Sequence, residues 1–386
     1  MKRLVLVMTI LILGVSGAAY AQTTMPVFCG DLAQEDCDLL TRSQEAMRAL
    51  DSAAFDFNMN ITVSNIPDMT DPVTVTVMGN GAYSGASSVT TDMTAMESDP
   101  GQAVLSVLDN LDLDFSLTVT APPEFMSEVD KNAPNSLTLQ LRLVDGVGYL
   151  NLDTLQPLLG DMGDSGMSGW TGLDLAGLVR ALMEQMPDLF SGMTAGMSAS
   201  MMDSTAMQAY IEQFSDPAFL NQFATIEKVD IGMPDETTFR VTIDFGALMS
   251  NPAFENMMQD MMRQQLEAQG QTLSQAEMDQ ALAMSSQILT NMVFTIDETI
   301  GNDDAYVRAV HGTFSLDMSA MMAAMDTGSK RSGSQAAPSV TIDLTLFSNS
   351  FNSVPPITAP EDATVIPYES LLSMIGGMSG MMQQSG

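Results

Sequence analysis

The stretch that decides the fold is residues 55–63, which reads FDFNMNITV. Apolar residues alternate here with Asp, Asn and Thr, and successive side chains of a β-strand point to opposite faces. The segment therefore predicts a strand with one apolar and one polar face. The same alternation returns at 73–77, 113–119, 137–143, 239–245 and 340–346. We expect a large antiparallel sheet whose apolar face is covered by helices, by the sheet itself or by a ligand.

Helical patterns separate the predicted strands. Predicted helices cover 38–54, 173–190, 203–215, 246–269 and 273–289, and a short helix begins at 367. Predicted strands cover 55–63, 72–84, 86–97, 112–121, 137–144, 147–152, 224–233, 237–245, 291–299, 304–318 and 338–348. Asp145-Gly146 predicts a tight hairpin turn, because Gly tolerates positive φ. This order predicts an α+β fold.

We expect a single domain over residues 22–375, built on one continuous, mainly antiparallel sheet. Helical insertions are expected near 153–220 and 246–289, and residues 376–386 are expected to form a flexible tail of Gly, Ser, Met and Gln.

The N-terminus has the pattern of a secretory signal peptide over residues 1–21. Lys2 and Arg3 precede an apolar run, and Ala19-Tyr20-Ala21 is a small-x-small cleavage site. An uncleaved anchor is disfavoured because the run is shorter than the ~20 residues that span a bilayer. No Cys directly follows the cleavage site, so the lipid-attachment box of bacterial lipoproteins is missing. We expect a soluble secreted protein, periplasmic or extracellular, without stable membrane insertion after cleavage.

The chain is strongly acidic, with 48 Asp and Glu residues against 13 Lys and Arg residues and a formal net charge of −35. Loss of Lys2 and Arg3 with the signal peptide would make it −37. Such an excess repels nucleic acid and anionic membranes, so neither is expected as a partner. It also keeps a hydrophobic, methionine-rich protein soluble.

The two cysteines, Cys29 and Cys37, lie in a short acidic stretch near the predicted mature start. In an oxidising compartment we expect them to form a disulfide that joins the N-terminal turn to the first helix. Their spacing is not C-x-x-C and no His lies nearby, which disfavours a redox or metal role.

Catalytic motifs are missing from the sequence: it contains no G-x-S-x-G, H-E-x-x-H, P-loop or dinucleotide fingerprint. The sole histidine, His311, lies in a predicted strand without a nucleophile motif near it, so a structural or surface role is expected. Acidic pairs such as Asp303-Asp304 are expected in solvated turns. We therefore expect a protein that is not an enzyme and that carries no cofactor and no metal.

Methionine is unusually frequent, at 36 residues, and it clusters in the predicted helices and their flanks. Three interpretations stay open: ordinary core filling, a pliable apolar lining that adapts to varied ligands, and copper(I) capture by thioethers. The copper interpretation is the weakest, since the clusters lack His. The only tryptophan, Trp170, follows a Gly-rich loop, where it caps a cavity mouth or anchors the core.

Several segments together resemble a known family. They are ALDSA (49–53) running into FDFNMNI, the hairpin LVDGVGYL (143–150), WTGLDL (170–175), VTIDLTL (340–346) and ITAPEDA (357–363). The chain is similar to the LppX/LprG type of exported lipid-binding proteins, within the LolA/LolB-like superfamily. The resemblance implies a strongly curved half-barrel sheet, with helices that close its concave apolar face around a cavity for lipid. This sequence departs from the family in its missing lipobox cysteine, its length and its methionine content.

The leading hypothesis is a secreted, non-enzymatic carrier or binding protein for a lipid or other apolar molecule. The predicted ligand-binding residues, on strands, helices and the Gly-rich loop, are Phe57, Met59, Leu117, Leu139, Leu141, Trp170, Val241, Met258 and Met262. Affinity would come from apolar burial, at about 25 cal/mol per Å². One alternative is a structural or protein-interaction module with a dry core, and another is a Met-based copper-binding protein. The sequence does not identify the ligand or a donor or acceptor protein.

Overall fold

The computed structural model describes residues 27–65, 71–89, 99–123, 134–155, 168–185, 216–268, 292–317 and 338–370, with the isolated positions 278, 286, 289, 290 and 372. Several predicted features lie outside these residues: the signal peptide, the helix at 203–215, nearly all of that at 273–289, and the tail.

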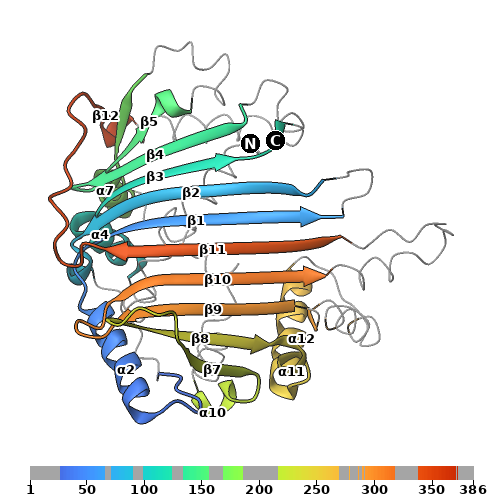
Figure 1. The fold of residues 1–386 in the computed structure, drawn as a ribbon. Helices are drawn as coiled ribbons and strands as arrows, with labels where there is room; N and C mark the ends of the chain where they lie inside the picture. Colours follow the sequence, from blue (N-terminus) through green and yellow to red (C-terminus); the bar gives the residue numbers. More distant parts are fainter. Residues whose placement is uncertain are drawn as a thin grey trace.

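Within the described residues, twelve strands form one open sheet in the order β12-β6-β5-β4-β3-β2-β1-β11-β10-β9-β8-β7 (Figure 1). Their bounds are β1 Ala53–Ser64, β2 Val73–Ser84, β3 Asp112–Thr120, β4 Ser136–Val144, β5 Val147–Asn151, β6 Trp170–Asp174, β7 Ala224–Val229, β8 Glu236–Asp244, β9 Met292–Gly301, β10 Val307–Asp317, β11 Ser339–Asn349 and β12 Thr364–Ile366. All neighbours pair antiparallel except β12 and β6, which are parallel. The prediction of an α+β fold with a mainly antiparallel sheet is confirmed.

The first and last long strands join the two halves of the sheet. β1 pairs with β2 on one side and with β11 on the other, each over eleven register positions. Because β11 comes nearly three hundred residues after β1, the continuity of the sheet depends on a long-range contact. Figure 1 shows the resulting ladder, with β12 at one edge and β7 at the other.

The helices lie near the ends of the strands (Figure 1). Their bounds are α2 Gln34–Arg48, α4 Pro100–Asn110, α7 Leu175–Gln185, α10 Pro217–Leu220, α11 Phe245–Met249 and α12 Pro252–Ala268, with short 3-10 turns η2 Ala86–Ser88 and η3 Leu152–Thr154. Aspartates cap several N-termini: Asp99 accepts a hydrogen bond from the Gln102 amide, and Asp244 accepts one from the Ala247 amide. The Cys29–Cys37 disulfide joins the segment before α2 to its first turn, as predicted.

The hairpin prediction is confirmed. β4 and β5 are joined by Asp145 and Gly146, whose φ angles of 50° and 76° are those of a primed turn. A side chain at Gly146 would also collide with Ala176, so this turn packs directly against α7.

Some boundaries differ from the sequence prediction. The first helix ends at Arg48 rather than Ala54, because Asp51 is held by Asn352 and Ser87 and the strand already begins at Ala53. The helix expected at 246–269 is two helices, because Asn251 caps a second helix that starts at Pro252.

Other elements were not anticipated. Residues 100–110 form α4, whereas the sequence pattern suggested no helix there. The Gly-rich loop ends in strand β6, and residues 364–366 form β12 beside it. The strand expected at 86–97 begins instead as the 3-10 turn η2, and residues 90–98 lie outside the described part.

Candidate functional site: the apolar face of the sheet

The strand register places most of the predicted ligand-binding residues on one face in two adjacent rows. The first, which we call the Phe57 row, runs across nine strands through Leu139, Leu117, Gly79, Phe57, Leu346, Val310, Glu298, Phe239 and Lys228. Three predicted residues from β1, β3 and β4 thus share one line. Leu141 lies on the same face in the neighbouring row, paired with Phe115.

The second line, which we call the Met59 row, contains the predicted residues Met59 and Val241. It runs through Leu137, Val119, Val77, Met59, Leu344, Gly312, Ile296, Val241 and Ile226. Every member is apolar or Gly. The two rows together make a continuous apolar surface across the centre of the sheet.

Aromatic rings lie flat on this surface because glycines make room for them. Phe57 pairs with Gly79 and Phe55 with Gly81, and a side chain at either glycine would collide with the opposing ring. Phe57 also stacks on Phe115, with ring centroids 6.1 Å apart and an angle of 8° between the planes. Rings that lie along the sheet form a smooth apolar floor, and this placement leaves the space above them free for other groups.

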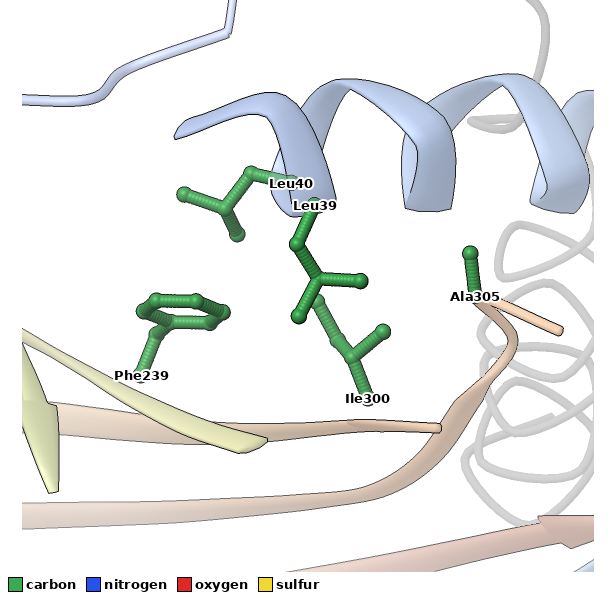
Figure 2. Close-up of a cluster of buried hydrophobic side chains, with 5 residues drawn as sticks. All are labelled: Leu39, Leu40, Phe239, Ile300 and Ala305. Atoms are coloured by element: carbon green, nitrogen blue, oxygen red, sulfur yellow. The ribbon is translucent and has the colours of Figure 1, made fainter. Parts of the chain in front are cut away.

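The two ends of the apolar face are covered by the protein itself. Near β8 and β9, Leu39 and Leu40 of α2 pack on Phe239 and Ile300, which are 1% and 0% exposed (Figure 2). Helices α10, α11 and α12 surround a neighbouring cluster around Phe219, Phe223 and Leu248.

The other end of the apolar face is covered near β3 to β5. There Leu155 covers Leu117 and Leu139. Leu175, the first residue of α7, lies over Gly148, and α4 is tied to α7 by Arg180 and Asp109. The sheet therefore has a closed region at each end of its apolar face.

The centre of the face is the most open part. Leu344 of β11 is 37% exposed, and a side chain built at its neighbour Gly312 would meet no atom within 4 Å. Phe57, Met59, Phe314 and Ile296 are half-buried rather than sealed. Of the large apolar side chains that this face carries in β4, β3, β2, β1, β11, β10 and β9, all described strands, Leu344 is the most exposed.

One ionisable residue interrupts the apolar surface. In the seven neighbouring strands β4, β3, β2, β1, β11, β10 and β9, all of which the structure describes, Glu298 is the only charged side chain at the paired positions of this face. Burial raises the pKa of its carboxyl, although the side chain keeps partial contact with solvent.

Sequence reasoning missed Glu298, although a signal was present. Residues 292–300 read MVFTIDETI, and a glutamate occupies a position where the two-residue period requires an apolar side chain. Gly312 was missed for a related reason, since a glycine in a strand carries no face preference of its own.

Trp170 does not join the other predicted residues. It pairs with Asn151, whereas its neighbour Thr171 pairs with Leu150 of the apolar face, so the indole lies on the opposite side of the sheet. There the Arg142 guanidinium lies 5.6 Å from the ring centroid and donates a hydrogen bond to the Thr358 carbonyl. This position suits an anchor for the segment that leads into β12.

Met258 and Met262 are both half-buried on α12. They follow Phe254 at intervals of four residues, and Phe254 packs into the cluster around Phe219. The helix itself lies beside the ends of β8 and β9 (Figure 1).

The opposite face of the sheet is mainly polar, although Met78, Val293 and Phe347 are exposed on it. Threonines and ion pairs connect neighbouring strands, for example Thr118 with Thr138 and Arg240 with Asp297. Hydrogen bonds from Arg240 lower the pKa of Asp297. His311 is half-buried on this face, with Nε2 3.1 Å from Asp343.

A separate hollow of about 350 Å³ lies at the β7–β8 connection, lined by residues that include Lys228, Ile231, Met233 and Glu236. None of the predicted ligand-binding residues lines it. Among the described residues, no three His, Cys, Asp or Glu side chains are placed to share a metal ion. Within the same part of the chain, no helix combines the length and apolarity that a membrane span needs.

No protein-family model matches the chain, and no curated protein matches it in sequence. The functional assignment therefore depends on the geometry of the sheet and on the sequence.

Proposed function

We propose that this protein is a non-enzymatic carrier or binding protein for a lipid or other apolar molecule, which lies on the apolar face of the sheet. The observation that carries the proposal is the open centre of that face, where Leu344 is exposed beside Gly312 while both ends are covered. A protein that only needed a core would cover such a surface, because each exposed Å² of apolar area forfeits about 25 cal/mol.

We further propose that the sheet curves around the ligand as a half-barrel of the LppX/LprG and LolA/LolB-like kind, with the helices as rims. The disulfide supports a location outside the cytoplasm, where such bonds persist. In that location a carrier would shield its apolar ligand from water.

The direct test is native mass spectrometry of the protein purified from its own host, paired with organic extraction. An apolar molecule in fixed stoichiometry would support a carrier and define its chemical class. A ligand-free mass, together with no uptake of lipid or apolar dye on titration, would refute the proposal and favour the interaction module.

A matched pair of variants in β10 locates the site. Gly312→Leu should fold normally and weaken uptake of an apolar dye about tenfold, because loss of about 55 Å² of apolar contact removes about 1.4 kcal/mol. Ser315→Leu places the same side chain on the exposed polar face of the same strand and should leave uptake unchanged. Equal effects of the two variants in a fluorescence titration would place the ligand elsewhere.

A further inference from the structure

Glu298 lies at the boundary between the covered and the open part of the apolar face. Across the strands, its neighbours in the Phe57 row are Phe239, sealed under α2, and the half-buried Val310. Along β9, the neighbours on the same face are Ile300, which is fully buried, and Ile296, which is half-buried. The carboxyl therefore lies at one end of the open surface, against the wall that α2 forms.

The carboxyl has no hydrogen-bond or ion-pair partner within the described part of the chain. The nearest cation in its row is Lys228, two strands away at about 10 Å. Lys228 is already paired with Asp36 of α2, with Nζ 2.7 Å from Oδ1. Burying a carboxylate without a partner is costly, so a group that serves stability alone would not be expected here.

We propose that Glu298 binds the cationic amine head group of an amphiphile whose apolar tail lies along the Phe57 row. This inference rests on the proposed carrier function and names the chemical class of its ligand. An ammonium group would donate charge-assisted hydrogen bonds to the carboxylate and supply the missing counter-charge. The net charge of the chain, −35, attracts cations and repels anionic amphiphiles.

The row also provides a track for the tail. From Glu298 on β9 to Phe57 on β1 there are three strand spacings of about 4.8 Å, or about 14 Å, before the row passes under Leu155. Between them lie Val310 and Leu346, both apolar and half-buried, and the Phe57 ring lies over Gly79. A molecule with one polar end and one long apolar end matches a site with one charge at one end of an apolar line.

The test measures head-group preference at constant tail length. Dodecylammonium, dodecanol and dodecanoate are titrated against the full-length mature protein loaded with an apolar fluorescent dye. The amine should displace the dye at a concentration about tenfold lower than the alcohol, and the carboxylate should be weakest. In Glu298→Gln the amine should lose this advantage while the alcohol binds as before.

Two further variants separate a local from a general charge effect. Asp56→Asn makes the same change of charge on the opposite, solvent-exposed face of β1, and it should keep the amine preference. Glu298→Met replaces the carboxyl with an apolar side chain and should abolish the amine preference in the same way as Glu298→Gln. The test then does not depend on the correct folding of a single variant.

An unchanged ratio of amine to alcohol affinity in Glu298→Gln overturns the inference, as does an equal loss in Asp56→Asn. If neither the dye nor the alcohol binds the unaltered protein, the carrier function itself fails. Binding of dye and alcohol without an amine preference leaves the carrier function standing and removes only the role of Glu298.

Discussion

At the scale of single residues, Glu298 and Asp297 show how one strand creates two opposite electrostatic environments. Asp297 faces the polar side, where the Arg240 guanidinium holds the pKa of the carboxyl below its usual range. Glu298 faces the apolar side, where burial raises its pKa. The two neighbours therefore make opposite contributions to stability at neutral pH.

The stability contribution of Glu298 is expected to depend on pH. A carboxyl with a raised folded-state pKa binds its proton more tightly in the folded than in the unfolded chain, whose value is near 4.5. The free energy of unfolding should therefore fall as pH rises through the folded-state pKa. Glu298→Gln should be more stable than the unaltered protein at pH 8, by about 1–2 kcal/mol.

Denaturant unfolding at several pH values checks this expectation. The difference between the two proteins should shrink toward zero near pH 4, where Glu298 is protonated in both states. A variant that is less stable at pH 8 would mean that the carboxylate has a stabilising partner.

At the scale of elements, the pairing of β1 with β2 depends on glycines that receive aromatic rings. A side chain at Gly79 would collide with the Phe57 ring and approach the Ser116 carbonyl oxygen of β3 to 2.7 Å. The backbone oxygen belongs to the ladder and cannot move away without breaking it. Strand β2 therefore combines an apolar face with two positions, Gly79 and Gly81, that leave no room for a side chain.

Gly79→Val should lower the free energy of unfolding by about 1–3 kcal/mol, through overpacking and displacement of Phe57. Gly312→Val is the matched comparison, because that position has open space above it, and its cost should be under about 0.5 kcal/mol. Chemical denaturation measures both. Equal costs would mean that the two glycines have the same surroundings.

At the scale of the whole molecule, the sheet is covered at both ends and open in the middle. α2 seals β8 and β9, and α7 with η3 covers the region near β4 and β5 (Figures 1 and 2). The stability of the protein should come mainly from these two ends, and the centre is then free to bind a ligand.

Truncation of an apolar side chain should therefore cost very different amounts in the two regions. Leu39→Ala, at a position 5% exposed under α2, should reduce the free energy of unfolding by about 3 kcal/mol. Leu344→Ala, at a position 37% exposed, should cost under about 1 kcal/mol in the ligand-free protein. A large cost for Leu344→Ala in denaturant unfolding would mean that the centre is sealed.

Sequence alternation predicted the strands and their faces well because the period of two depends only on local backbone geometry. Phe57, Met59, Leu117, Leu139, Leu141 and Val241 were expected on one face, and the register places all six there. The short elements were harder to predict. β6 and β12 have five and three residues, so their formation depends on neighbours more than on pattern.

By itself, the sequence determined the α+β class, the long strands, the Asp145-Gly146 turn and the disulfide, because each depends on residues close together in the chain. Only the tertiary structure decided that β11 pairs with β1, that Trp170 lies on the polar face, and that Glu298 shares a row with Phe57. These features join residues that are tens to hundreds of positions apart. No local pattern encodes such a pairing, because it is selected by the free energy of the whole sheet.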